Sequence, residues 1–166
     1  WIPKRFLYTS SLAATGPSPS EIPLTEEMAP EPIEPYGKAK LKSEEYLKNT
    51  PFPVTSFRPG IVLGAGDNNS LTLFKMAKTG IGMKVAGINQ KVSCIDVEDL
   101  VEALCALLER GEAGRIYNVG SGTERTNWDT VHAVLALVQA SPALVQRVAD
   151  RPGHDRRYAM RDDAIH

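Results

Sequence analysis

The fold class follows from one short run, Arg5-Phe6-Leu7-Tyr8-Thr9-Ser10-Ser11, which is apolar and aromatic and then ends in hydroxyl residues. A run of this kind predicts a buried strand. Open α/β sheets place functional groups at the carboxyl ends of their strands, and Ser11 stands at such an end. We therefore predict that this strand delivers side chains with a chemical role.

A helix is predicted from about Tyr36 to Lys48, with Asn49 and Pro51 ending it. Tyr36 and Lys40 are four residues apart, which places both side chains on one face of that helix. A neighbouring ammonium lowers the pKa of a phenol, as a general acid or base requires. The same spacing is also common in solvated surface pairs, so by itself it leaves both interpretations open.

The segments around this helix define its place in the fold. A proline-rich, acidic stretch from Gly16 to Pro35 predicts an ordered surface loop that could bring Ser11 and Tyr36 together. Beyond the helix, residues 54–64 read as another buried strand, which breaks into a glycine-rich turn.

Strands and helices continue to alternate towards the C-terminus. We predict a helix from Ser70 to about Lys78, a strand over 92–95, and a helix that begins near Val97 and ends at Gly111. A last helix starts at Thr126 or Asn127 and ends near Ser141. This alternation predicts the α/β class.

Composition limits the classes of function. The 166 residues, 42% hydrophobic, can bury one sizeable core. A formal net charge of −1 offers no electrostatic basis for binding nucleic acid or an anionic membrane. The sequence shows no span-length apolar run and no signal-peptide pattern, so we expect a cytoplasmic protein. Cys94 and Cys105 lack ligand spacing, so we expect reduced core thiols and no metal site.

In order and spacing, the strand ending at Ser11, the Tyr36/Lys40 helix and the Arg58-Pro59-Gly60 turn resemble the extended short-chain dehydrogenase/reductase family, the NAD-dependent epimerase/dehydratase group. The resemblance implies the C-terminal part of a Rossmann-type doubly wound parallel sheet plus a small substrate-binding α/β region. Residues 1–66 would complete the dinucleotide-binding domain. Residues 67–166 would mainly bind substrate, with 85–110 returning to the Rossmann sheet.

The resemblance also implies roles for individual residues. Tyr36 would move the proton of a substrate hydroxyl, Lys40 would lower the tyrosine pKa and bind the nicotinamide ribose, and Ser11 would orient the substrate oxygen. The cofactor would be NAD, with NADP also open, because the residue that reads the ribose 2′-position lies outside this sequence. The expected cofactor-binding residues are Thr9, Ser10, Tyr36, Lys40, Pro59 and Val62.

Departures from the family pattern bear on the substrate. Sugar-nucleotide 4,6-dehydratases carry an Asp-Glu pair where this chain has Leu12 and Ala13, neither of which can transfer a proton. The segment 150–158 is similar to a run in which an arginine binds the substrate diphosphate, a role we assign to Arg151, with His154 approaching the same phosphates.

Two further positions that bind substrate in relatives carry different residues in this chain. Ile61 stands where many relatives have Asn, and Val92, next to Lys91, stands where they have Arg. We include Ser11, Ile61 and Lys91 with Arg151 and His154 as the expected substrate-binding residues. Both replacements weaken the polar grip on a diphosphate, so the substrate class stays open.

These features predict an NAD-dependent sugar-nucleotide epimerase-like enzyme, homodimeric when full length. The alternative is an NAD(P)-dependent reductase or hydroxysteroid-type dehydrogenase acting on a less polar alcohol or ketone. A 4,6-dehydratase and a non-catalytic binding protein of the same fold are less favoured. The helices beginning near Tyr36 and Ser70 are the candidate dimer interface by family analogy.

The chain has no G-x-G-x-x-G after a strand, the fingerprint that holds a dinucleotide pyrophosphate. We therefore interpret the sequence as lacking the N-terminal glycine-rich half, and we expect the 166 residues alone to be inactive. Calorimetry of this chain should detect little or no NAD binding, and tight binding would contradict that interpretation.

Overall fold

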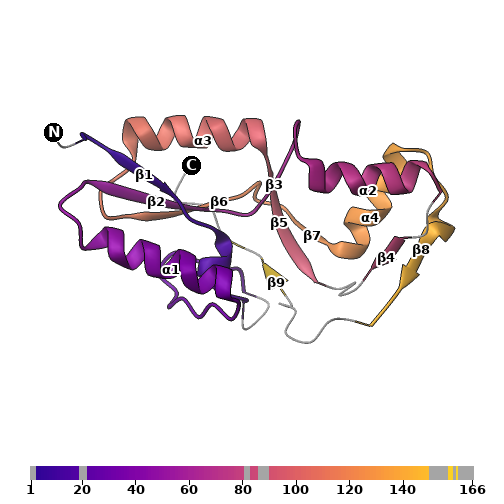
Figure 1. The fold of residues 1–166 in the computed structure, drawn as a ribbon, viewed down its shortest axis with the longest axis horizontal. Helices are drawn as coiled ribbons and strands as arrows, with labels where there is room; N and C mark the ends of the chain where they lie inside the picture. The colour runs from indigo at the N-terminus through magenta and orange to yellow at the C-terminus, as the bar shows by residue number, and fades with distance from the viewer. Residues whose placement is uncertain are drawn as a thin grey trace.

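A computed structural model describes residues 3–18, 22–80, 83–85, 90–149, 157–158 and 160 of the chain, with only the backbone described at 69, 83–84 and 157–158. Figure 1 shows the order of the elements along the chain. The strands are β1 (Phe6–Thr9), β2 (Val54–Pro59), β3 (Ile61–Leu63), β4 (Met83–Val85), β5 (Lys91–Asp96), β6 (Ile116–Val119), β7 (Glu124–Thr126), β8 (Val145–Arg147) and β9 (Arg157–Tyr158). The helices are η1 (Leu12–Ala14), α1 (Pro35–Lys48), α2 (Asn68–Lys78), α3 (Val97–Arg110), α4 (Asn127–Leu137) and η2 (Pro142–Leu144).

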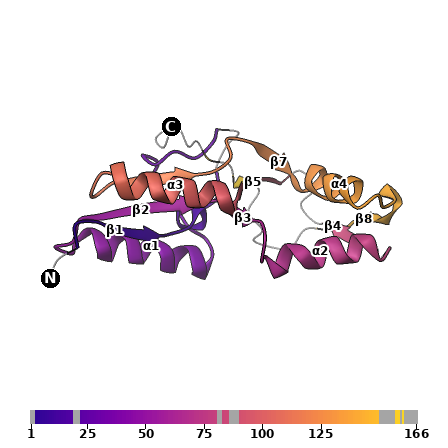
Figure 2. The same cartoon turned by 90° about the horizontal axis from the view of Figure 1, so that it is seen from above.

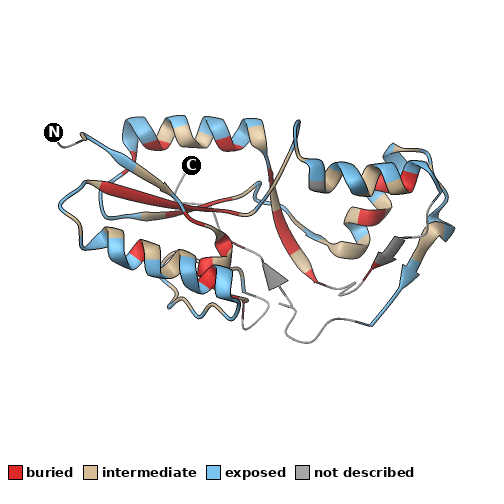
Figure 3. Cartoon of the chain, viewed as in Figure 1, coloured by how far each residue is buried: buried red, intermediate tan, exposed pale blue. Residues whose placement is uncertain are grey.

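A parallel sheet of order β1-β2-β6 forms one end of the molecule. Helices α1 and α3 lie on its opposite faces, as Figures 1 and 2 show from two directions. Every residue of the central strand β2 is buried, which is visible as a continuous red strand in Figure 3. Burial on both faces is typical of a parallel sheet covered by helices on its two sides.

The side-chain alternation of the strands gives the two faces different characters. Towards α3, the strands present Phe57, Tyr117 and Val119, which form one core cluster with Leu100 and Leu107 of that helix. Towards α1, β2 presents Val54, Ser56 and Arg58, so a charged side chain occupies this buried face. The buried charge of this sheet therefore lies on its α1 face.

A single glycine separates β2 from β3 and passes the chain from the first sheet to a second one. That second sheet has the order β3-β5-β7, and β9 also pairs with β5. A Cβ at Gly60 would lie 2.4 Å from the carbonyl oxygen of Ser93, so the two backbones approach too closely for any side chain. The strand predicted over 54–64 is thus two strands in two sheets.

A smaller core lies at the far end of the molecule, between α2, α4 and the parallel pair β4-β8. It is built from a cluster of buried apolar side chains: Ala77, Val85, Val131, Val134 and Leu135. Strand β5 pairs with β3 and β7, whereas α3, which follows it directly, covers the first sheet. The segment 85–110 therefore contributes to both ends of the molecule.

The acidic loop before α1 lies along the outer edge of β6. The carboxylate of Glu26 accepts a hydrogen bond from the backbone N–H of Asn118 at 2.8 Å, and the carbonyl of Leu24 accepts one from the Asn118 side chain at 3.3 Å. Within the described residues, β1 pairs with β2 alone, so its other edge has no partner strand. The loop thus covers one edge of the first sheet and leaves the other open.

The α/β class predicted from the sequence is confirmed by this arrangement. Some local predictions differ from the structure. Helix α2 begins at Asn68, and Cys105 is exposed on α3 and is not a core thiol. Cys94 is half-buried in β5, and this burial raises the pKa of its thiol. Within the described part of the chain, no helix is long and apolar enough to cross a membrane.

Helix α4 begins with a capping box that makes its stability depend on pH. The hydroxyl of Thr126 accepts from the backbone N–H of Asp129 at 3.0 Å, and the Asp129 carboxylate accepts from the Thr126 hydroxyl and backbone. The side-chain hydrogen bond, and then the backbone one, lowers the pKa of Asp129. Its stabilisation is therefore present above the unfolded-state pKa of about 3.9 and is lost as pH falls through the lower folded-state value.

We expect Thr126→Ala to raise the pKa of Asp129 towards its ordinary value and to lower Tm. The deficit in Tm should be larger at neutral pH than below the titration of the carboxyl group. Carboxyl NMR titration and thermal melting measure the two effects, with Thr123→Ala as an exposed control. An unchanged Asp129 pKa in Thr126→Ala would contradict the assignment.

Candidate active site

The three residues predicted to be catalytic come from the carboxyl end of β1 and the first turns of α1. Ser11 caps η1, where its hydroxyl oxygen accepts the backbone N–H of Ala13 at 3.2 Å. Within the described residues, the hydroxyl hydrogen of Ser11 has no acceptor. The cap therefore fixes the oxygen and leaves its hydrogen available for a ligand.

Lys40 lies between two aromatic rings at the start of α1. Its Nζ is 5.7 Å from the ring centroid of Tyr36 and 5.4 Å from that of Tyr8, and it donates to the carbonyl oxygen of Thr9 at 3.0 Å. An ammonium has three N–H donors, and the Thr9 carbonyl takes one of them. The Tyr36 ring is 56% exposed, and its hydroxyl has no hydrogen-bond partner in the described part of the chain.

Close backbone packing holds α1 against η1. A Cβ at Gly37 would lie 2.2 Å from the carbonyl oxygen of Ala13, a distance that no side chain can occupy. Glycine at position 37 therefore permits the helix that carries Tyr36 to touch the segment capped by Ser11. The structure thus brings together the two elements that carry Ser11 and the Tyr36/Lys40 pair.

A buried ion pair lies two turns along the helix from Tyr36. Arg58 of β2 donates through Nε to Oε1 of Glu44 at 2.9 Å and through Nη2 to Oε2 at 2.6 Å. The third guanidinium nitrogen donates to the hydroxyl of Thr15 at 3.2 Å, and Ser10 donates its hydroxyl to Glu44. All four residues are at most 5% exposed.

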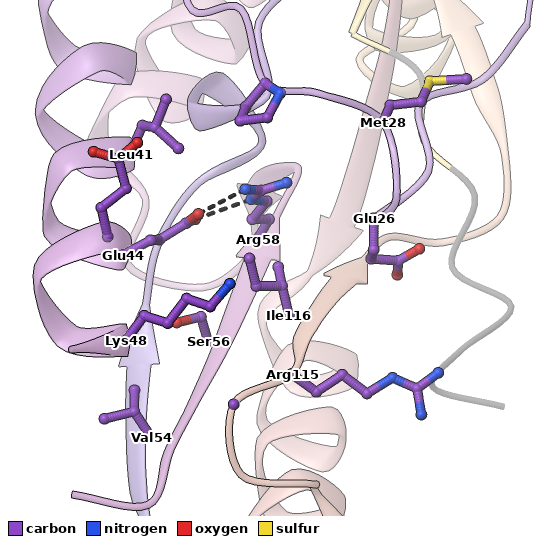
Figure 4. A pocket seen from close by; sticks show the side chains of 13 residues that line it. Glu26, Met28, Leu41, Glu44, Lys48, Val54, Ser56, Arg58, Arg115 and Ile116 are labelled. Carbon is purple, nitrogen blue, oxygen red and sulfur yellow. Dashed lines mark hydrogen bonds and ion pairs between the residues drawn. The ribbon is translucent and has the colours of Figure 1, made fainter. Parts of the chain in front are cut away.

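A cavity of about 240 Å³ opens beside this pair. Figure 4 shows Glu44, Leu41 and Lys48 entering it from α1, Arg58 and Ser56 from β2, and Glu26 from the acidic loop. The dashed lines in the figure mark the two bonds between Arg58 and Glu44. The cavity therefore lies between α1 and the strands β2 and β6.

The residues predicted to bind the cofactor occupy different environments. Thr9 contributes its carbonyl to Lys40, and Ser10 is 3% exposed with its hydroxyl given to Glu44. Pro59 is buried at the end of β2, opposite Val119 in the register. Val62, half-buried in β3, packs against the core cluster under α3. The Ser10 side chain is thus already engaged within the protein.

Apart from Ser11, the residues predicted to bind substrate lie on the second sheet or outside the described chain. Ile61 is 47% exposed on β3. Lys91 of β5 makes an ion pair with Glu124 of the neighbouring strand at 3.5 Å. Arg151 and His154 lie outside the described residues. Among the residues that are described, no group of three or more His, Cys, Asp and Glu side chains is placed to hold a metal ion.

Sequence reasoning named Arg58 only as part of the Arg58-Pro59-Gly60 turn, and it did not single out Glu44 or Thr15. Two signals were present in the sequence. Glu44 follows Tyr36 and Lys40 at the same four-residue spacing, which predicts a common helical face. Arg58 is the one charged residue of a strand predicted to be buried, and a buried charge needs a partner.

The sequence model of the NAD dependent epimerase/dehydratase family matches residues 2–120. The chain belongs to this family. The resemblance found in the sequence is therefore confirmed. The matched residues include the carboxyl ends of β1 and β2 and the helix that carries Tyr36.

Similar proteins include several enzymes of nucleotide-sugar metabolism. A dTDP-glucose 4,6-dehydratase of Xanthomonas campestris is 31% identical over 94% of this chain and 49% of its own length. A GDP-6-deoxy-D-mannose reductase of Pseudomonas aeruginosa is 30% identical over 85% of this chain and 51% of its own. The structure of a dTDP-glucose 4,6-dehydratase of Streptomyces venezuelae, solved with NAD, matches with a TM-score of 0.87 at 25% identity, over 97% of this chain and 52% of that one. The chain spans about half the length of these relatives.

The burial of the Glu44–Arg58 pair lets us predict how substitutions change the free energy of unfolding. Arg58→Met leaves a buried carboxylate without its cation, so we expect the free energy of unfolding to fall by about 3–5 kcal/mol. The double variant Glu44→Leu/Arg58→Met removes both charges and should lose less than Arg58→Met alone, although two buried hydroxyls lose their partners.

Urea denaturation of the chain measures these differences. Lys48→Met, an exposed change on the same helix, serves as the control and should stay within about 0.5 kcal/mol of the parent. A double variant at least as unstable as the single one would show that the pair does not behave as a buried charge pair.

Proposed function

We propose that the complete protein is an NAD-dependent, epimerase-type enzyme that acts on a nucleotide sugar, with Tyr36 as the acid/base. The observation that carries this proposal is the set Ser11, Tyr36 and Lys40 without a second proton-transfer group beside Ser11. Leu12 is 3% exposed in η1, and Ala13 follows it. This arrangement can oxidise and reduce a hydroxyl-bearing carbon but offers no side chain there for eliminating water.

The donors in the structure suit a nicotinamide ribose and a substrate hydroxyl. Two N–H groups of Lys40 remain for ribose hydroxyls, and the exposed Tyr36 phenol can exchange a proton with the substrate. NAD, when bound, supplies the acceptor and donor for the hydride. We further propose that Thr9 and Ser10 contact the cofactor through their backbone, with Pro59 and Val62 lining the nicotinamide end of the site.

In this mechanism each residue of the set has one task. Tyr36, as phenolate, takes the proton of the substrate hydroxyl while the C–O bond becomes a carbonyl, and it returns that proton when the carbonyl is reduced. Lys40, whose Nζ is 5.7 Å from the centroid of the Tyr36 ring, binds the nicotinamide ribose through its remaining N–H groups. Ser11 donates its free hydroxyl hydrogen to the same substrate oxygen and orients it.

The remaining assignments extend the same proposal. Ser11, Ile61, Lys91, Arg151 and His154 would bind substrate, the last two at the diphosphate. We also propose a homodimer. The 74% exposed Tyr46 on α1 supports this helix as an interface element.

A second candidate function is reduction of a keto sugar. The 30% identity to a GDP-6-deoxy-D-mannose reductase over 85% of this chain favours it. This reaction needs the same proton-transfer residues and no second carboxylate, so Leu12 and Ala13 are equally compatible with it.

The complete gene product should convert a UDP-, dTDP- or GDP-hexose into its 4-epimer, which NMR of the sugar protons detects. Tyr36→Phe should lower kcat at least about a hundredfold because the acid/base hydroxyl is lost. Tyr46→Phe, an exposed change on the same helix, should leave kcat unchanged.

The outcome distinguishes the candidates. Oxidation of a reduced nicotinamide cofactor by a keto sugar, without epimer formation, would favour the reductase. Turnover only of apolar ketones would exclude the nucleotide-sugar proposal. A biological activity that survives Tyr36→Phe intact would indicate a binding protein.

A further inference from the structure

Three side chains of α1 face the carboxyl end of β1 at intervals of four residues. Tyr36, Lys40 and Glu44 share this helical face. Lys40 donates to the Thr9 carbonyl at 3.0 Å, and Glu44 accepts the hydroxyl of the next residue, Ser10. Successive turns of the helix are therefore bonded to successive residues of the strand end that leads directly into Ser11.

Arg58 fixes the orientation of the carboxylate in this link. Both oxygens of Glu44 are engaged, one by Nε and the other by Nη2 of Arg58, while Nη1 reaches Thr15 just after η1. Ser10 and Thr15 bracket η1, so the network contacts the segment capped by Ser11 on both sides. Arg58 also directly precedes Pro59 at the end of β2.

The burial of the network gives it little freedom to move. Its side chains are at most 5% exposed, where water cannot replace a lost hydrogen bond at low cost. The hydroxyl of Ser10 is the weakest member, because its loss leaves both charged contacts between Glu44 and Arg58 in place. Removal of the Ser10 hydroxyl would thus break the bond between the helix and the strand end while the Glu44–Arg58 ion pair stays intact.

We propose that Ser10 and Glu44 are positioning residues that set the distance between the hydroxyls of Ser11 and Tyr36, an inference that rests on the proposed function of those two residues. Neither needs to touch substrate or cofactor through its side chain. Their bond prevents α1 from shifting along the strand end and so holds Tyr36 in place. A displacement of about 1 Å at reacting groups is enough to cost about a hundredfold in rate.

The first test is kinetic and uses the complete gene product with the nucleotide sugar it turns over. Ser10→Ala should lower kcat by about ten- to a hundredfold, with the KM values for NAD and sugar within about twofold of the parent. Ser56→Ala is the matched control, a serine 7% exposed on β2 that takes no part in the network, and it should keep the parent kcat. Equal kcat in both variants would overturn the proposal. So would a Ser10→Ala effect confined to the KM for NAD, which would indicate direct cofactor contact.

A double-variant cycle tests whether the two residues act as one link. If they do, Glu44→Gln/Ser10→Ala should have a kcat close to that of Glu44→Gln, because the bond is already disturbed. Multiplied losses would contradict a shared link. Thermal melting of Glu44→Gln shows whether it folds, and the Ser10→Ala kinetics remain decisive if it does not.

A readout without turnover separates this inference from the proposed function. In protein labelled at tyrosine Cζ, the Tyr36 resonance is assigned by its disappearance in Tyr36→Phe. It should shift in Ser10→Ala and stay in place in Ser56→Ala. A shift in a protein that turns over no substrate would support the positioning role while the proposed function fails, and an unmoved resonance in an active enzyme would overturn the positioning role alone.

Discussion

The buried contact between Glu44 and Arg58 is the constraint on which the α1 side of the first sheet depends. Two charges removed from water cost several kcal/mol each unless their attraction and additional hydrogen bonds compensate. Here both carboxylate oxygens and all three guanidinium nitrogens are engaged. An apolar pair could fill the same space, so the stability of the fold does not require the charges. Their contribution is to fix the alignment of α1 on β2, because a bidentate contact restricts the geometry of the two side chains.

The sequence predicts the elements of the site well because each depends on local signals. The strand before Ser11 and the helix from Tyr36 follow from apolar runs, spacing and proline positions, and the structure has a strand and a helix there. The break at Gly60 was missed because it arises from the approach of the Ser93 carbonyl, a contact across sheets. The network around Arg58 was missed for the same reason, since its members are far apart in the chain.

Similar proteins carry the names of different activities, so the fold alone does not specify the reaction. Over aligned regions that make up about half of each relative, this chain is 30% identical to a protein named as a reductase and 31% identical to one named as a dehydratase. Leu12 and Ala13 lie in a single turn of 3-10 helix that Ser11 caps, and the Ser11 hydroxyl oxygen accepts the backbone N–H of residue 13. Because this bond uses the backbone of residue 13, it would persist with other side chains at positions 12 and 13.

The two edges of the first sheet differ, because one is covered by a loop and the other is open among the described strands. Glu26 and Leu24 occupy the backbone and the Asn118 side chain at the β6 edge, whereas among the described strands β1 offers its outer edge unpaired. Among the described strands of this sheet, β1 alone has an edge open to a further strand, which would lie next to the strand that leads into Ser11. Any polypeptide strand that pairs with this edge would therefore lie beside the segment that carries Ser10 and Ser11.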